Sequence, residues 1–308
     1  MPIPEIQLST WAKSQQTKLA INTHESIRKA LNSPISKLKL NRFSEGNHFE
    51  IYLQGSYRNK TNIRADSDVD VVVQLNTIFC SNKSQMNPLD RKRYDSVFKS
   101  SNYTWNNFKQ DILTSLHNYY PPGNIIVGKK SLKLQKGSNR IAADIIPCIQ
   151  YRYYEKFESE HEDYISGICF YTRDSRREII NYPKLHFHNG ADKNSKTKQN
   201  YKPTVRLFKN AKKMIINRYS YPLEAPSYYI ECLLYNVPNN CFVNNRQDTY
   251  IKVVNWLCDN LNSSFICQNE MLNLFGNKPE QWKLENAQYF IQSLIELWEN
   301  WYNARLRY

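Results

Sequence analysis

A run of acidic and branched residues from Asp68 to Val73 constrains the fold of this 308-residue chain more than any other feature. Successive side chains of a β-strand project to opposite faces, so Asp68 and Asp70 share one face while Val69, Val71 and Val73 share the other. The valine face predicts a strand that packs on a core. The two carboxylates opposite offer the oxygen ligands that Mg²⁺ prefers. The segment therefore predicts a divalent-metal site on a half-buried strand.

Asp66 has the same strand parity as Asp68 and Asp70, so either adjacent pair could form this site. The apolar run begins only at Val69, which places Asp66 before the strand, in a solvated turn beside Arg64. Asp68 and Asp70 are therefore the predicted metal-binding pair.

A possible phosphate-binding segment, Gln54-Gly55-Ser56, is separated from Asp68 by a linker of eleven residues. Gly55 has no side chain, so the backbone can come close to a triphosphate, and the Ser56 hydroxyl and amide can donate to its phosphates. We predict that Gln54, Gly55 and Ser56 bind nucleotide. A phosphate-binding loop followed by a strand with two carboxylates indicates nucleotidyl transfer.

A third acid is needed for a two-metal centre, in which the ions lie roughly 3.5–4 Å apart. In the predicted strand 140–148, Ile141, Ala143 and Ile145 share one face and Asp144 lies on the other. A carboxylate in such an apolar run is costly unless a metal ion or a basic partner compensates it. Asp144 is the predicted third ligand and the candidate acceptor of the proton of the attacking hydroxyl.

These elements resemble the DNA polymerase β-like nucleotidyltransferase superfamily, whose pattern is Gly-Ser, a spacer, Asp-x-Asp and a later lone Asp on a neighbouring strand. Further segments are similar to those of the CD-NTases, the bacterial relatives of cyclic GMP-AMP synthase in anti-phage signalling. The resemblance covers roughly residues 5–240 and is carried by residues 6–11, 22–31, 201–209 and 226–238.

The resemblance implies an α+β fold, with a polymerase β-like nucleotidyltransferase core of a small mixed sheet and helices, plus a C-terminal helical lobe. The predicted domains are residues 1–200, the core with an N-terminal helix, and residues 201–308, the helical domain. It also implies that Lys209 neutralises triphosphate charge, that Ser227 contacts phosphate and caps the following helix, and that Tyr228 stacks on a base.

The implied function is that of a cytoplasmic CD-NTase. Such an enzyme condenses two or three nucleoside triphosphates, drawn from ATP, UTP, GTP and CTP, into a cyclic second messenger, with two Mg²⁺ or Mn²⁺ ions at the acids. A cyclic-nucleotide-sensing effector of an anti-phage (CBASS) system would respond to the messenger. The opening segment is similar to the branch that includes pyrimidine users, so UTP is a candidate substrate. The alternatives are a template-independent RNA-tailing or CCA-adding nucleotidyltransferase and a non-catalytic nucleic-acid-binding module.

The formal net charge of +14 attracts polyanions of either kind, triphosphates or nucleic acid. The seven cysteines are odd in number and include no Cys-x-x-Cys spacing, which argues against a disulfide framework and a structural zinc site. Without the clustered Cys and His of the animal synthase's zinc thumb, we expect no obligatory nucleic acid. The sequence shows no secretory signal and no apolar stretch near twenty residues, so we expect no membrane association, and a monomer.

Periodicity predicts the secondary structure around these motifs. Asn22 and Glu25 resemble a capping box that begins a helix, and Trp105, Phe108 and Ile112 lie on one stripe of a helical segment from about 91 to 119. The segment from Gly190 to Asn200 is predicted to be the loop that joins the lobes. Strands are predicted at 49–54, 68–75, 124–127, 131–135 and 140–148.

Overall fold

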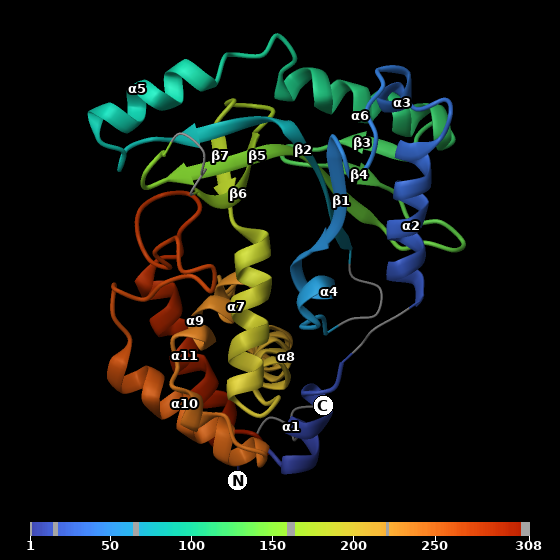
Figure 1. The fold of residues 1–308 in the computed structure, drawn as a ribbon. Coiled ribbons are helices and arrows are strands. Elements are labelled where there is room, and N and C mark those ends of the chain that lie inside the picture. Colours follow the sequence, from blue (N-terminus) through green and yellow to red (C-terminus); the bar gives the residue numbers. More distant parts are fainter. Residues whose placement is uncertain (1, 15–17, 64–67, 159–163, 220–221, 303–308) are drawn as a thin grey trace. The chain divides into compact units, whose positions relative to one another are not determined.

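The computed structural model describes residues 2–14, 18–63, 68–158, 164–219 and 222–302 (Figure 1). Packing divides the chain into two compact units. The sheet unit comprises Thr17–Tyr57 and Asp66–Pro183, and the helical unit comprises Met1–Gln16, Arg58–Ala65 and Lys184–Tyr308. A mixed sheet with helices and a separate helical unit confirm the predicted α+β class. The predicted domain boundary at residue 200 stays a prediction.

The strands of the sheet unit form one mixed sheet, in which β1, β2, β5, β4 and β3 are consecutive neighbours and β6 links β5 to β7. β2 and β5 are parallel, and the other pairs are antiparallel. Each predicted strand overlaps an observed one, although β2 and β5 extend further and β6 and β7 were not predicted. The strands are β1 Phe49–Gln54, β2 Val69–Asn82, β3 Ile125–Val127, β4 Leu132–Leu134, β5 Ala143–Tyr154, β6 Tyr164–Tyr171 and β7 Glu178–Asn181.

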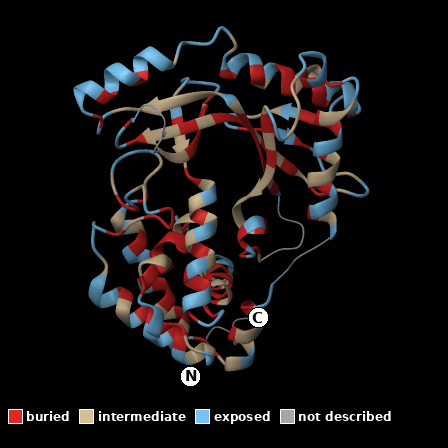
Figure 2. Cartoon of the chain, in the orientation of Figure 1, coloured by how far each residue is buried: buried red, intermediate tan, exposed pale blue. Residues whose placement is uncertain are grey.

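The valines of β2 form the centre of this unit. Val69, Val71 and Val73 are fully buried, as the alternating pattern predicted. Val72, on the same face as Asp70, is also fully buried, whereas Asp70 itself is partly open. Figure 2 shows buried residues along the middle of the sheet. This packing fixes β2 firmly and with it the position of its acids.

Helices α2 (Lys18–Asn32), α3 (Lys37–Leu40), α5 (Pro88–Val97) and α6 (Trp105–Tyr119) complete the sheet unit. In α6, Thr104 and Asn107 form a capping box that satisfies free backbone amides of the first turn. Phe108 and Ile112 are fully buried in the predicted stripe, and the indole of Trp105 donates a hydrogen bond to the carbonyl of Pro147, in β5, at 2.8 Å. The stripe therefore anchors α6 on the sheet.

Two helix predictions in this unit were wrong. The segment 91–119 is two helices, because the Thr104 cap starts a new helix after the residues that follow α5. Asn22 lies inside α2 and does not begin it, since the helix is already formed at Lys18 and buries Ala20. The Thr104 capping box is a local signal that the stripe alone did not reveal, whereas the start of α2 depends on packing that the Asn22 signal does not record.

The helical unit is built around one large hydrophobic core to which α1, α8, α9, α10 and α11 contribute. Its centre includes the fully buried Phe208, Leu233, Val253 and Phe290. Pro203 lies in the first turn of α8, where a missing N–H costs little. The helices are α1 Glu5–Trp11, α7 Pro183–Lys196, α8 Tyr201–Tyr219, α9 Ser227–Tyr235, α10 Arg246–Asn260 and α11 Leu284–Glu299, with the 3₁₀ turn Asn239–Cys241; α4, Gly55–Asn59, follows β1.

The predicted loop at Gly190–Asn200 is wrong, because most of it belongs to α7. Gly190 is a packing residue in this helix. A Cβ atom there would lie 2.2 Å from Nε2 of Gln268, so the glycine lets the two chain segments approach closely. Within the described part of the chain, no helix combines the length and apolar character needed to cross a membrane.

Candidate active site

Asp70 and Asp144 are direct neighbours across the sheet. The parallel pairing of β2 with β5 places Asp70 opposite Asp144, and Val69 opposite Ala143. Neighbouring strands lie about 4.8 Å apart, and residues in register project to the same face. The sheet therefore brings together two of the three predicted acids, which are far apart in the sequence.

Gly55 lies directly against the Asp70 carboxylate. β1 is antiparallel to β2 and pairs Gln54 with Asp70, so the chain leaves β1 at this carboxylate. Gly55 has a φ of +65°, and a Cβ atom there would lie 2.3 Å from Oδ2 of Asp70. Both observations require glycine. Ser56 follows as the second residue of α4 and is partly buried.

Asp68 immediately precedes β2 and is exposed to solvent. Its Coulombic effect on Asp70 shows that the two carboxylates lie near each other. Asp66, the alternative that we rejected, lies outside the described residues. Gly55, Ser56 and the three predicted acids, Asp68, Asp70 and Asp144, all belong to the sheet unit.

The electrostatics of Asp70 fit a cation-binding site. Burial, followed by repulsion from Asp144 and then Asp68, raises the pKa of Asp70 to about 7. Carboxylates crowded in this way repel one another. A divalent cation relieves the repulsion, because it supplies the positive charge that balances the buried carboxylates. Carboxylate oxygens are also the ligands that suit Mg²⁺ and Mn²⁺. The donor set therefore fits the predicted metal.

The sequence analysis did not single out Ser131, and it named Gln54 without assigning a role to its side chain. Ser131 donates a hydrogen bond from Oγ to Oδ1 of Asp144 at 2.7 Å, which orients that carboxylate. Ser131 precedes β4, and its role depends on the pairing of β4 with β5 that no local motif encodes. Oε1 of Gln54 is buried and has no hydrogen-bond partner among the described residues, so it is an acceptor that could receive a donor from a ligand.

Lys209 lies in the helical unit, in a buried polar cluster around Glu231. Its ammonium group donates to the Glu231 carboxylate and to Oγ1 of Thr61, the latter at 3.2 Å. Asn59 and His186 also contact Glu231, each at 3.2 Å. Burial favours the neutral carboxyl, but Lys209 and His186 outweigh it and hold the pKa of Glu231 well below its usual range. The described contacts of Lys209 therefore balance its charge within this unit.

Ser227 and Tyr228 begin α9 in the same unit. Ser227 is exposed, and the prediction that it caps the helix is wrong, because Pro226 is the N-cap and makes no side-chain cap bond in this helix. Tyr228 stacks on His186, with ring centroids 5.2 Å apart and planes at 23°. Asn269 donates to its hydroxyl at 3.4 Å, and the residue as a whole is partly buried.

Comparison with known proteins identifies the family. Residues 188–299 match the cGAS/DncV-like nucleotidyltransferase C-terminal helical domain. The chain is 44% identical to a cyclic UMP-AMP synthase of Rhodothermus marinus, over 98% of this chain and 99% of that protein. It is 43% identical to the cyclic nucleotide synthase CdnE01 of Staphylococcus haemolyticus, over 98% of this chain and 100% of that protein. The chain belongs to the CD-NTase family.

Solved structures agree. The structure of Rhodothermus marinus CdnE c-UMP-AMP synthase with Apcpp and Upnpp has a TM-score of 0.87 to this CD-NTase, at 44% identity over 98% of both chains. Elizabethkingia meningoseptica CdnE cyclic dinucleotide synthase with GTP and Apcpp has a TM-score of 0.75 at 29% identity, over 96% of this chain and 98% of that one. The predicted family, polymerase β-like fold and enzyme class are therefore confirmed.

This CD-NTase is thus a nucleotidyltransferase of the cyclic nucleotide synthase class. The presence of Asp68, Asp70 and Asp144 is accounted for by this class, without the RNA-tailing alternative or the non-catalytic binding module. The roles of the individual site residues, the metal and the nucleotides used stay predictions.

Proposed function

We propose that this CD-NTase condenses UTP and ATP into a cyclic dinucleotide, with Asp68, Asp70 and Asp144 holding two Mg²⁺ or Mn²⁺ ions. The observation that carries the chemistry is the register of β2 and β5, which places Asp70 opposite Asp144 and next to Gly55. The choice of nucleotides rests on the 44% identity to a cyclic UMP-AMP synthase over nearly the whole of both chains. More distant relatives are named dipyrimidine and dipurine synthases at 32% and 30% identity, so base choice varies at that distance.

The sheet unit provides the groups for phosphate and metal binding. When bound, the ions would polarise the reacting phosphate and lower the pKa of the attacking hydroxyl. Asp144, oriented by Ser131, is placed to accept the proton of that hydroxyl. Gly55 lets the chain pass close to the Asp70 carboxylate, and its neighbours Gln54 and Ser56 would bind the phosphates. These residues fix phosphate and hydroxyl in position, which lowers the entropic cost of the reaction.

The helical unit contributes Lys209, Ser227 and Tyr228 to nucleotide binding in this proposal. The exposed Ser227 offers a hydroxyl to a phosphate oxygen. Tyr228 already stacks on His186, and in this proposal a base would contact its aromatic ring. Lys209 stays in the proposed nucleotide-binding set, with its buried ammonium group paired with the Glu231 carboxylate.

The cellular role follows from the family as a proposal. The cyclic nucleotide would act in the cytoplasm as the messenger of an anti-phage (CBASS) system and bind a downstream effector. The enzyme would work as a monomer and without obligatory nucleic acid.

The test is incubation of the purified protein with the four ribonucleoside triphosphates and Mg²⁺ or Mn²⁺, followed by phosphatase and mass spectrometry. A phosphatase-resistant product containing one UMP and one AMP, formed equally well from UTP and ATP alone, would support the proposal. The double variant Asp68→Asn with Asp70→Asn should make none, because amides cannot supply the negative charge that the metals require. A resistant product of other bases would overturn the nucleotide assignment. Linear oligomers, or extension of added RNA only, would overturn cyclisation.

A further inference from the structure

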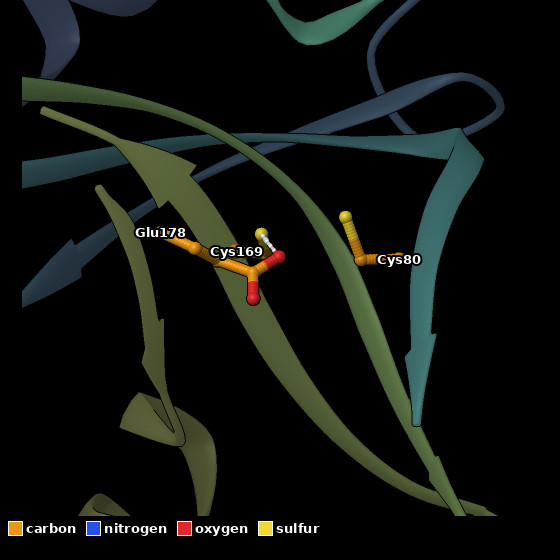
Figure 3. Close-up of side chains that lie close together, drawn as sticks. All are labelled: Cys80, Cys169 and Glu178. Carbon is orange, nitrogen blue, oxygen red and sulfur yellow. Dashed lines mark hydrogen bonds between the residues drawn. The ribbon is translucent and has the colours of Figure 1, made fainter. Parts of the chain in front are cut away.

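Two cysteines and a glutamate from three different strands meet near the C-terminal end of β2. Cys80 of β2, Cys169 of β6 and Glu178 of β7 bring their sulfur and carboxylate oxygen atoms within 4.8 Å of one another. Figure 3 shows these side chains, with the hydrogen bond from Sγ of Cys169 to Oε1 of Glu178, which measures 3.3 Å. Cys169 is buried, Cys80 is partly buried and Glu178 is exposed. The cluster thus has a dry side and a solvent side.

These spacings are close to those of a zinc site. Tetrahedral zinc, with bonds of about 2.3 Å to sulfur and about 2.1 Å to oxygen, holds two sulfurs about 3.8 Å apart and a sulfur and an oxygen about 3.6 Å apart. Sγ of Cys169 lies 3.3 Å from Oε1 of Glu178, and all three ligand atoms lie within 4.8 Å of one another. Small side-chain rotations would bring these distances to the values of a zinc site. Thiolate ligands favour zinc and related ions over Mg²⁺.

A disulfide fits this arrangement less well. β5 runs between the two strands, with Tyr151 paired to Cys80 and Ile149 paired to Cys169. The two cysteines are therefore not neighbours in the sheet, whereas a disulfide needs Cα atoms within about 7 Å. An ion that spans the two sulfurs requires no movement of the strands.

The surroundings supply supporting hydrogen bonds and an entry path. The hydroxyl of Tyr171 lies 3.5 Å from Sγ of Cys80 and donates to Oε1 of Glu178 at 3.3 Å. Tyr171 also packs edge-on against Trp105, and both line a cavity of about 590 Å³. Metal ions need such second contacts and access.

We propose that Cys80, Cys169 and Glu178 bind one thiophilic divalent cation of the zinc class, with a water molecule from the exposed Glu178 side as fourth ligand and Tyr171 as a positioning residue. The site is separate from the catalytic acids. On the neighbouring strand β5, their partners Asp144 and Tyr151 are seven residues apart, which at about 3.3 Å per residue corresponds to roughly 23 Å along the sheet. Its role is structural, because it joins β2 to β6 and β7. No short spacing motif announces it, since its ligands lie on separate strands.

The test begins with metal-free, reduced, full-length protein titrated with Co²⁺, whose thiolate complexes absorb strongly. We expect one equivalent to bind with a thiolate-to-cobalt band, and Zn²⁺ to displace it. Cys80→Ser and Cys169→Ser should lose the band, and Glu178→Gln should bind at least about tenfold more weakly. Cys258→Ser, which changes an exposed cysteine of α10, is the matched control and should bind as the wild type does.

Thermal unfolding gives a second readout. Zn²⁺ should raise the Tm of the wild type and of Cys258→Ser, but not that of Cys80→Ser or Cys169→Ser. Nucleotidyl transfer with Mg²⁺ should persist in all four proteins, so it reports folding of the variants independently of zinc binding. Absence of the cobalt band from the wild type, its persistence in Cys80→Ser, or a disulfide between Cys80 and Cys169 on peptide mapping of the native protein would overturn the proposal.

Discussion

Replacing Asp70 with asparagine should stabilise the metal-free protein at alkaline pH while abolishing nucleotidyl transfer. Burial, with the Asp144 and Asp68 carboxylates, raises the pKa of Asp70 from its usual value of 3.8 to about 7. The folded protein therefore holds this proton more tightly than the unfolded chain does. Its stability falls as the pH rises from about 4 to about 7, because folding then requires a buried charge.

The size of the effect follows from the two pKa values. They differ by about three, and each pKa step is worth about 1.4 kcal/mol, so the upper limit is about 4 kcal/mol. Because solvent reaches part of the carboxylate, we expect about half of this, about 2 kcal/mol. In thermal unfolding, this corresponds to a gain on the order of 4–8 °C in Tm. Asparagine has nearly the same volume as aspartate and no charge to bury, so it should capture this gain.

The assay is thermal unfolding in buffer containing a chelator, from about pH 5 to about pH 9. The Tm advantage of Asp70→Asn over the wild type should grow with pH and level off above about pH 7. At alkaline pH, added Mg²⁺ should raise the Tm of the wild type and leave the variant unchanged. Asp259→Asn, an exposed change on α10, is the control and should follow the wild type. An Asp70→Asn protein no more stable than the wild type at alkaline pH, or equal stabilisation of both by Mg²⁺, would refute the reasoning.

Three further predictions follow from the same contacts. Gly55→Ala should lower kcat by about 100-fold, because its Cβ would displace the Asp70 carboxylate. Gly123 has a similar positive φ, but a Cβ there would meet no atom within 4 Å, so Gly123→Ala should be nearly fully active. Glu231→Gln should lower the free energy of unfolding in urea by about 3 kcal/mol, because it leaves the buried charge of Lys209 without a counter-charge. The exposed change Glu299→Gln is the control and should alter this free energy by less than about 0.5 kcal/mol. Nuclease-treated enzyme should remain active, and any binding to duplex nucleic acid should weaken steeply with salt.

Each of these predictions has an outcome that contradicts it. Equal losses of kcat in the two glycine variants would assign the effect to backbone strain and not to contact with Asp70. A Glu231→Gln protein as stable as its control would show that the buried pair contributes little. Strict dependence of activity on DNA or RNA would make the basic surface a nucleic-acid sensor.

The sequence by itself determined the local features of the site. Alternation of Asp68, Asp70 and the valines specifies a strand with one apolar face, because side-chain direction depends only on neighbouring residues. The choice of a hard, oxygen-ligated metal also follows from residue chemistry, whereas the contact with Asp70 that requires glycine at Gly55 was known only from the structure. Together with the similar segments elsewhere in the chain, these features were enough to predict the α+β fold and the family.

Only the tertiary structure decided which distant residues meet. The register of β2 with β5 sets Asp70 opposite Asp144, and the pairing of β4 with β5 brings Ser131 to the same carboxylate. The continuation of β2 beyond its predicted end brings Cys80 near Cys169. Local patterns also misplaced the start of α2 and predicted a loop where α7 lies. Periodicity records which way a side chain points, whereas register and helix limits are set by the packing of segments remote in the sequence.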